Sequence, residues 1–309
     1  MFGFKSRMRA DSTRPRHLAV LAGFVGILAG AVVDDARSAS APFAKPWMDA
    51  THGPETEMQV QQYDPDTFVI RQSIRTNFEG PFIFLFFGTS RVLQVDTGAG
   101  GLQIRPTIDR VIADWVKSKG LKSIQLMVAH SHGHGDHVAG DQEFVGRPET
   151  TVVGHTPEQV AAFFNIRSWP EEVVPYDLGG RVLDIIPSPG HEAAEISVFD
   201  RRTHLLLTGD FLYAGRLYFK VDNFATFRAS VDRVVNFTRS LSVSWVLGNH
   251  IEMTQTPGRD FQFHAPSHPL EHSLELPYAR LLELQSAVHA MGDVPRLEVH
   301  DDFIIYPLP

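Results

Sequence analysis

The most constraining feature of this sequence is a histidine-rich loop directly after a short apolar run. Residues 124–129 are mostly apolar and predict a buried strand, and the next eight residues read His-Ser-His-Gly-His-Gly-Asp-His. The small residues between the histidines allow the larger side chains to converge without crowding. Because loops at strand ends are where a rigid scaffold displays reactive groups, we expect the chemistry of the chain to be centred on this loop.

The candidate metal ligands extend beyond the loop. The loop itself supplies four of them: His132, His134, Asp136 and His137. Three more lie downstream, each after a predicted strand: His191, Asp210 and His250. The sequence has no cysteine, which excludes thiol nucleophiles, iron–sulfur clusters and cysteine zinc fingers. Any metal must therefore be held by imidazole and carboxylate groups, which zinc and similar divalent metals accept, and seven such groups are enough for two metals.

Strand-like and helix-like segments alternate along most of the chain. Apolar runs between turn residues predict strands over residues 82–87, 91–95, 124–129, 151–154, 181–186, 196–199, 205–207, 245–247 and 303–306. Helical spacing predicts helices over residues 106–119, 225–241 and 277–291, and a capping box starts a short helix at residue 156. This mixture implies one layered α/β domain, which we assign to residues 76–309. Residues 41–75 are rich in Pro, Asp and Gln and predict an irregular lead-in.

The first 40 residues have the order of a secretory signal. Five basic residues precede an apolar run over residues 18–33, and small residues follow around residues 38–41. The apolar run of 16 residues is shorter than the roughly 20 that cross a bilayer comfortably. An uncleaved membrane anchor is the alternative interpretation. We therefore expect a periplasmic or secreted protein, with membrane contact only through this segment.

The charge of the remaining chain bears on its partners. Residues 1–40 contain six Lys or Arg and three Asp, so the rest carries a net charge of −11 against −8 for the whole chain. A strongly acidic protein repels phosphate backbones. Nucleic acid is therefore not an expected partner, and a small-molecule substrate is.

The pattern His132-x-His134-x-Asp136-His137, followed in order by His191, Asp210 and His250, resembles the metallo-β-lactamase-fold hydrolase superfamily. Asp96-Thr97-Gly98 resembles the first motif of that family, and the match covers residues 80–255. The successive intervals, 54 residues from His137 to His191, 19 on to Asp210 and 40 on to His250, resemble the glyoxalase II branch more than most.

This resemblance implies a four-layer αββα sandwich with a two-metal site at one edge of the paired sheets. The residues implied to hold the first metal are His132, His134 and His191. Those implied to hold the second are Asp136, His137 and His250. Asp210 would bridge the two metals, and Asp96 would lie near the site without binding either. The implied cofactors are two divalent metal ions, expected to be Zn²⁺.

A two-metal site has a direct chemical use. Two cations a few ångströms apart hold a water between them and lower its pKa to about 7, which gives hydroxide at neutral pH. Asp136 and Asp210 offset the positive charge, and one of them can accept the proton of the nucleophile. The β-lactamases of this fold resemble one another in having Cys or Ser at the bridging position. Asp210 therefore favours ester, thioester, lactone or phosphodiester hydrolysis.

Several aromatic and histidine residues have two interpretations. Tyr213 resembles a tyrosine that some lactonases of this fold aim at the substrate carbonyl, where it can stabilise the oxyanion; the alternative is a tyrosine packed in the strand exit. Phe211 and Phe219 either line a substrate cleft or belong to the core. Histidines recur at 264, 268 and 272, but prolines interrupt a helix there, so we interpret these three as solvated loop residues.

Together these observations predict a zinc-dependent hydrolase that uses a metal-bridged hydroxide to cleave a small ester, thioester or lactone. The expected catalytic residues are Asp136, Asp210 and Tyr213. Three alternatives stay open. One is a metallo-β-lactamase, the second is a persulfide dioxygenase with a single iron, and the third is a binding module that keeps a structural metal.

Overall fold

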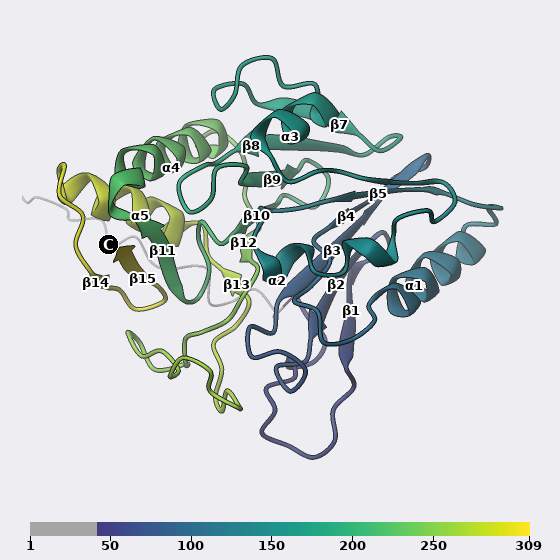
Figure 1. Ribbon diagram of the computed structural model, residues 1–309, viewed down its shortest axis with the longest axis horizontal. Coiled ribbons are helices and arrows are strands. Elements are labelled where there is room, and N and C mark those ends of the chain that lie inside the picture. The colour runs from purple at the N-terminus through teal and green to yellow at the C-terminus, as the bar shows by residue number, and fades with distance from the viewer. Residues whose placement is uncertain (1–41) are drawn as a thin grey trace, which may run out of the picture. The chain divides into compact units, whose positions relative to one another are not determined.

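Two six-stranded sheets face each other within residues 42–309, the part of the chain that the computed structural model describes (Figure 1). The strands of the first sheet are, in spatial order, β1 (Met58–Asp64), β2 (Thr67–Gln72), β3 (Phe82–Phe87), β4 (Arg91–Val95), β5 (Gln125–Ala129) and β6 (Thr150–Val152). Strands β1 to β4 pair antiparallel, whereas β5 is parallel to both β4 and β6. The carboxyl ends of β4 and β5 therefore meet at one edge of this sheet.

The strands of the second sheet are, in spatial order, β13 (Glu275–Leu276), β12 (Trp245–Gly248), β10 (Leu205–Gly209), β9 (Ile196–Asp200), β8 (Val182–Pro187) and β7 (Val174–Asp177). Its only parallel pair among the described residues is β10 with β12. A smaller sheet consists of β11 (Arg216–Lys220), β15 (Ile304–Leu308) and β14 (Glu298–Val299). Because β10 and β12 are parallel, their carboxyl ends lie at the same edge of the second sheet.

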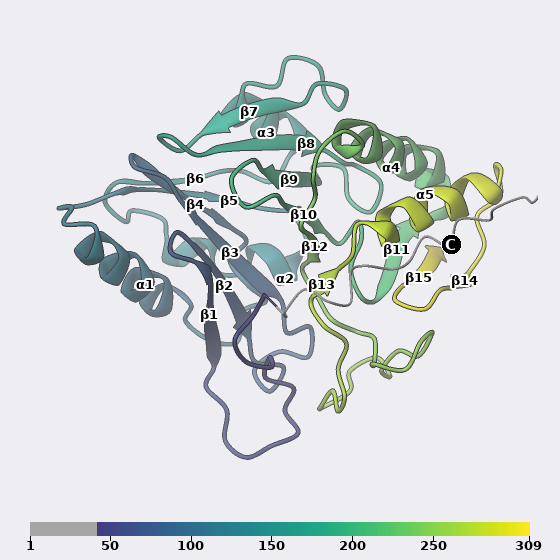
Figure 2. The same ribbon diagram turned by 180° about the vertical axis from the view of Figure 1, so that it is seen from behind.

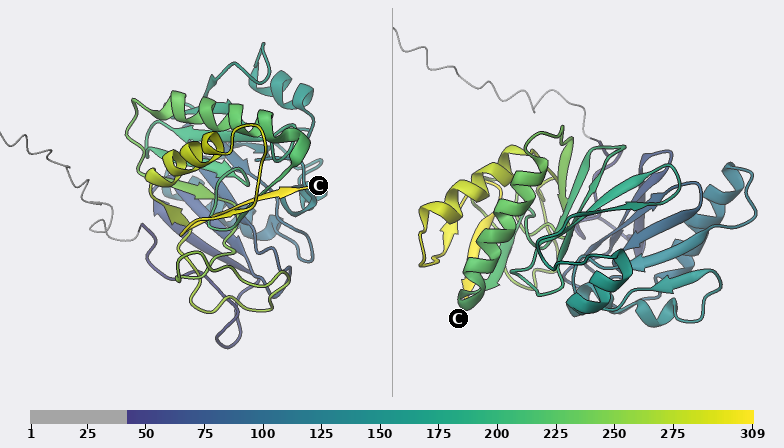
Figure 3. Two further views of the ribbon diagram at one scale, coloured as in Figure 1. Left: turned by 90° about the vertical axis from the view of Figure 1, so that its left-hand side faces the viewer. Right: turned by 90° about the horizontal axis from the view of Figure 1, so that it is seen from above.

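Helices cover the outer faces of both sheets. Helix α1 (Arg105–Ser118) packs on the first sheet, and the neighbouring helices α4 (Phe224–Thr238) and α5 (Ala279–Ala290) lie on the opposite side, against the second (Figures 2 and 3). The remaining helical segments are short: α2 (Gly135–Val138), η2 (Asp141–Glu143), α3 (Pro157–Phe164) and η3 (Val221–Asn223). The order helix, sheet, sheet, helix confirms the predicted four-layer αββα sandwich.

The sequence of β3 explains why two cores form around it. All six of its residues, Phe-Ile-Phe-Leu-Phe-Phe, are buried. Successive side chains of a strand point to opposite faces. Phe82, Phe84 and Phe86 accordingly join the core between the two sheets, whereas the alternate residues pack with the apolar face of α1. A strand covered on both faces reads as a continuous apolar run, which is how this segment was predicted.

The predicted irregular lead-in over residues 41–75 is wrong for its second half, because residues 58–72 form the hairpin β1–β2. The hairpin pairs along β3, with Ile70 opposite Ile83. Gln61, Arg71 and Gln72 are buried in this hairpin, and the two side-chain amides and the terminal nitrogens of Arg71 make hydrogen bonds inside the protein. Their polarity hid the strand pattern, and only pairing with a fully buried strand reveals it.

The secretory signal predicted over residues 1–40 lies outside the described residues. Within residues 42–309, none of the helices has both the length and the apolar character that crossing a membrane requires.

Asp66 ties the β1–β2 turn to both α1 and the second sheet, and it gives a prediction for stability. Its carboxylate accepts hydrogen bonds from the Trp115 indole at 2.8 Å and the Lys119 ammonium at 2.7 Å, and also from Arg202. Burial alone would raise the pKa of Asp66, but these donors lower it to about 2. Asp66→Asn should therefore lower the free energy of unfolding at pH 7 by about 1–2 kcal/mol, a figure kept small because Lys119 and Arg202 are partly exposed.

The pH dependence of this effect follows from the direction of the shift. A carboxylate whose pKa is lowered in the folded state stabilises that state above its ordinary pKa of 3.8, and the contribution disappears as the pH falls towards 2. Urea unfolding of the wild type and Asp66→Asn at pH 7, 4 and 2.5 measures the difference. A difference that stays constant down to pH 2.5 would show that the charge of Asp66 is not its source.

Candidate metal centre

The candidate ligands meet because four strands end at the same edge of the sandwich. Residues 130–137 follow β5 and end in α2, which runs along this edge (Figure 1). Asp210 comes directly after β10, and His250 follows β12 two residues after its end. These two strands are parallel, with Gly209 opposite Gly248. His191 arrives from the turn after β8.

The first cluster consists of His132, His134 and His191. Nε2 of His132 lies 3.0 Å from Nδ1 of His134, and Nε2 of His191 lies 3.2 Å from the first of these atoms and 3.0 Å from the second. Nδ1 of His191 lies 2.7 Å from the carbonyl oxygen of Tyr218. A carbonyl only accepts, so Nδ1 of His191 carries the proton and its Nε2 presents a lone pair to the cluster.

The second cluster consists of Asp136, His137, Asp210 and His250. Nε2 of His250 lies 3.2 Å from Nε2 of His137 and 3.2 Å from Oδ2 of Asp136. Nδ1 of His250 donates to the carbonyl oxygen of Glu79 at 2.9 Å. Nδ1 of His137 lies 3.0 Å from Oδ2 of Asp96. Both rings are therefore oriented by a contact at Nδ1, and each directs Nε2 to the centre of the cluster.

Asp210 is the residue that reaches both clusters. Its Oδ2 lies 3.7 Å from Nε2 of His137 and 3.7 Å from Nε2 of His191. Its Oδ1 lies 3.4 Å from Nε2 of His250 and has no hydrogen-bond partner although it is buried. A buried acceptor without a donor is costly. The resemblance implies that Asp210 binds two metals, and a bound metal would satisfy this oxygen.

The electrostatics of the cluster show that it requires positive charge. Burial alone would raise the pKa of Asp210, whereas His250 and His137 hold it well below its ordinary value. Burial alone would lower the pKa of His250, but Asp210 and Asp136 raise it to about 10. The buried carboxylate of Asp210 and the partly buried one of Asp136 thus need either protons on the imidazoles or bound cations. Converging ring nitrogens, an unpartnered carboxylate oxygen and an all-nitrogen and oxygen donor set fit divalent metals such as zinc.

A third group, formed by His130, Asp141 and His155, differs from these clusters. Nε2 of His130 lies 2.8 Å from Oδ1 of Asp141, and Nε2 of His155 lies 2.7 Å from Oδ2. These are ordinary distances for N–H groups donating to one carboxylate. In the two clusters above, by contrast, acceptor nitrogens face one another. The third group therefore stabilises the start of the histidine loop through hydrogen bonds to Asp141.

Asp96 lies beside the centre, as the resemblance implied. It accepts hydrogen bonds from the Ser131 main-chain N–H at 2.7 Å and the Ser131 hydroxyl at 2.9 Å, in addition to His137. Its backbone has a positive φ of 72°, a conformation that non-glycine residues rarely adopt. The carboxylate thereby fixes the first turn of the loop and the orientation of His137.

Tyr213 lines the cavity at the centre but is 2% exposed, and its hydroxyl lies 2.6 Å from the carbonyl oxygen of Arg216. Its one hydroxyl hydrogen is therefore directed to that carbonyl. A role in oxyanion stabilisation stays a prediction, and it requires Tyr213 to break this bond. Phe211 and Phe219 are buried in the core between the second sheet and α4, which favours their core interpretation.

The interpretation of residues 264, 268 and 272 as solvated is wrong for His268. This residue is 6% exposed, stacks on Phe261 and lies 2.8 Å from the carboxylate of Glu271. The prolines do prevent a helix, but the loop folds back on the protein. None of the three histidines belongs to a cluster that could hold a metal among the described residues.

Sequence reasoning missed several groups that support the centre. The carbonyl oxygens of Glu79 and Tyr218 orient two ligands, and a backbone atom leaves no signal in a side-chain pattern. Glu195 is fully buried behind the site, with neither carboxylate oxygen bonded. Burial raises its pKa well above the ordinary value, and the charge of Asp210 adds to the effect. Nothing in its local sequence distinguishes it from a surface glutamate.

The centre opens into a cavity of about 630 Å³. Besides the ligands, its lining includes Glu79, Tyr213, Arg216, Tyr218, Glu252, Phe263, Tyr306 and Leu308. Such a volume suits a small molecule. The site is thus a rigid set of converging donors at the base of an open cavity.

Comparisons with known proteins agree with this architecture. A family model described as "Metallo-beta-lactamase superfamily" matches residues 77–262, more than half of the chain. The fold is similar to that of TMB-1, at 16% identity over 76% of this chain and 99% of that chain, with a TM-score of 0.50. It is also similar to VMB-1, at 15% identity over 77% and 99%, with a TM-score of 0.50. A metallo-beta-lactamase from Pontibacter korlensis aligns at 16% identity over 75% and 99%, with a TM-score of 0.49. Curated proteins give no match.

Proposed function

The chain belongs to the metallo-beta-lactamase superfamily, whose members are mostly metal-dependent hydrolases, and on this basis we propose that it is a dinuclear zinc hydrolase of small esters, thioesters or lactones. The observation that carries the proposal is the position of Asp210, whose two oxygens reach ring nitrogens of both clusters. An aspartate at this position favours the ester-cleaving branches, because the β-lactamases of the fold resemble one another in having Cys or Ser there.

The residues of the chain have separable roles in such a reaction. Divalent cations held by the two clusters would supply an acidified water as nucleophile and polarise the substrate carbonyl. Asp136 and Asp210 reduce the net positive charge of the centre. One of these two carboxylates would take up the proton of the nucleophile. The Tyr218 and Glu79 carbonyl oxygens keep His191 and His250 in the tautomer that metal binding requires.

The walls of the cavity favour a small substrate over a polymer. The lining holds four carboxylates and a single Arg or Lys, Arg216. A phosphodiester backbone would meet repulsion from this surface. The tyrosines, Phe263 and Leu308 provide apolar contact area for an acyl or alcohol group.

Metal content and a substrate panel test the proposal together. We expect two zinc ions per chain in protein purified without chelator, and hydrolysis of at least one neutral ester, thioester or lactone that stops on chelation and returns with zinc. Phosphodiesters and a chromogenic cephalosporin complete the panel. One iron per chain with oxygen uptake would instead indicate the dioxygenase, and preferred cleavage of the cephalosporin would indicate a β-lactamase. Bound metal without any turnover would favour the binding module.

A further inference from the structure

One carboxylate at the cavity has no partner. Glu79 lines the cavity beside the ligand residues, and its side chain makes no hydrogen bond or ion pair with any residue in the described part of the chain. Its main-chain carbonyl accepts the hydrogen bond from His250 at 2.9 Å, which fixes the residue next to the centre. Its side chain is therefore available to a bound molecule.

The other charged groups of the lining are already paired. Arg216 contacts Glu252 at 3.2 Å and Asp260 at 2.7 Å, and it also donates to the main-chain oxygen of Phe261. Glu252 also accepts from the main-chain N–H of Arg216 at 2.8 Å. Asp136 and Asp210 belong to the metal clusters. Glu79 is thus the group that sets the charge preference of the cavity outside the centre.

Three aromatic side chains besides Tyr213 line the cavity. Tyr218 of β11 and Tyr306 of β15 occupy paired positions in the small sheet, with ring centroids 5.0 Å apart. Phe263 is 63% exposed and lies at the same cavity. The faces of such rings attract cations. An unpaired carboxylate with aromatic rings around one cavity is a site for an organic cation.

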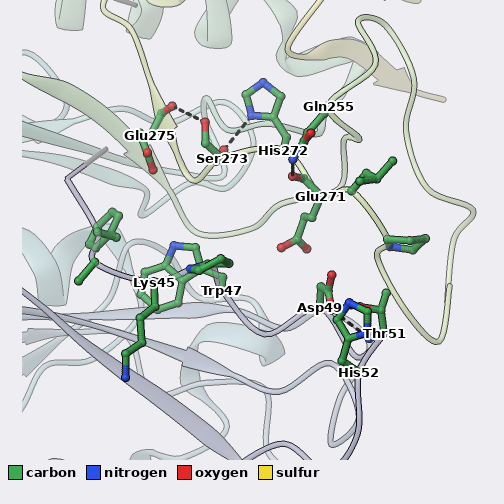
Figure 4. Close-up of a pocket in the computed structure, with 15 residues that line it drawn as sticks. Lys45, Trp47, Asp49, Thr51, His52, Gln255, Glu271, His272, Ser273 and Glu275 are labelled. Carbon is green, nitrogen blue, oxygen red and sulfur yellow. Dashed lines mark hydrogen bonds between the residues drawn. The ribbon is translucent and has the colours of Figure 1, made fainter. Parts of the chain in front are cut away.

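A second cavity contains a glutamate whose charge is paired, and it provides a comparison for Glu79. It lies between residues 43–52 and 255–275, has a volume of about 700 Å³ and shares no lining residue with the metal centre (Figure 4). Its Glu271 is held by Arg71 at 2.5 Å and 2.6 Å and by His268 at 2.8 Å. Glu79 has no comparable partner.

We propose that Glu79 selects substrates that carry a cationic group, such as a quaternary ammonium, on the acyl or alcohol part next to the scissile bond. This inference rests on the proposed function, because it assigns a substrate class to the same site. The ammonium would lie against Tyr218, Tyr306 and Phe263 with Glu79 as its counter-ion. Away from the metal ligands, an anionic group would find no unpaired Arg or Lys among the lining residues and would be disfavoured.

Two esters that differ only in charge test the selection. Butyrylcholine and 3,3-dimethylbutyl butyrate have the same shape, and the second replaces the ammonium nitrogen with carbon. We expect the zinc-loaded wild type to cleave the choline ester with a kcat/KM about five- to tenfold higher. In Glu79→Gln the ratio should fall several-fold, to the part that the aromatic rings supply, because glutamine keeps the shape and the main-chain bond to His250 but loses the charge. Glu57→Gln, an exposed site on the same sheet edge, should keep the wild-type ratio.

Equilibrium binding separates this inference from the proposed function. Choline and 3,3-dimethylbutanol are titrated calorimetrically into the zinc-loaded proteins, whose zinc content is measured in parallel. Tighter binding of choline to the wild type, weakened several-fold in Glu79→Gln at unchanged zinc content, supports the inference even if neither ester is cleaved. Equal binding of both alcohols, or a preference that Glu79→Gln leaves unchanged, overturns it even if neutral esters are hydrolysed.

Discussion

Asp210→Ala should reduce kcat by about 10²–10³-fold or more on any ester or lactone that the wild type cleaves. Asp210 lies within 3.9 Å of Nε2 of His132, His137, His191 and His250. Without its carboxylate none of the aspartates reaches both clusters, and a region rich in imidazole loses one of three carboxylates, beside Asp96 and Asp136, that compensate its positive charge. We therefore also expect fewer than two zinc ions per chain in the variant.

The measurement needs a fold control and a charge control. Circular dichroism and thermal unfolding should show that Asp210→Ala remains folded, because the truncated side chain lies at the edge of the core. Asp222→Ala removes one exposed carboxylate on η3 and should keep wild-type kcat. Asp210→Asn retains the shape and should be almost as inactive as alanine. Turnover within tenfold of wild type in Asp210→Ala would show that the two clusters do not act as one centre.

The positions of the ligands could be predicted because each of them follows a strand. A buried strand is visible as an apolar run, and a residue at its carboxyl end has little freedom in where it lies. His132 and His250 illustrate this rule: they come from different sheets, 118 residues apart, yet β5 and β12 end at the same edge. The spacing of the family motif supplied the rest of the prediction.

What could not be predicted are the contacts that depend on the packing of distant segments. The carbonyl of Tyr218 belongs to β11, a strand that pairs with β15 at the end of the chain. The carboxylate of Glu79 is unusual because it has no hydrogen-bond or ion-pair partner in the described part of the chain. No sequence pattern indicates such an absence. The hairpin β1–β2 was hidden because its buried glutamines and arginine are satisfied by groups far away in sequence.

The contacts of Arg181 also depend on segments distant in sequence and could not be predicted. Its substitution has the largest expected effect on stability. Arg181 was predicted only as the first residue of a strand, but its guanidinium is buried between the two sheets. It contacts Asp200 at 2.6 Å, the Thr67 hydroxyl at 2.6 Å and the main-chain oxygen of Asp66 at 2.5 Å. Its guanidinium also lies over the ring of Phe86, 4.9 Å from the centroid. One side chain therefore connects the β1–β2 hairpin to β9.

Arg181→Met should lower the free energy of unfolding by about 3–5 kcal/mol, because it leaves Asp200 as an unpaired buried charge. Burial would raise the pKa of Asp200, and Arg181 lowers it instead, so the pair stabilises the fold above the ordinary pKa of Asp200, 3.8, and loses that contribution in acid. Arg296→Met is the matched control. Arg296 pairs with Glu298 at 2.8 Å, and both side chains are partly exposed, at 53% and 30%, so its loss should cost less than about 1 kcal/mol.

The double variant Arg181→Met with Asp200→Asn distinguishes a buried charge from lost packing. Asparagine keeps an acceptor for the Thr203 hydroxyl, which lies 2.5 Å from Asp200, while removing the unpaired charge. Urea unfolding at pH 7 should recover about 1–3 kcal/mol of the loss in the double variant. No recovery would assign the cost of Arg181→Met to its contacts with Thr67, Asp66 and Phe86. In that case Arg181 would act by joining the two sheets through neutral groups, and acid would not weaken the wild type through Asp200.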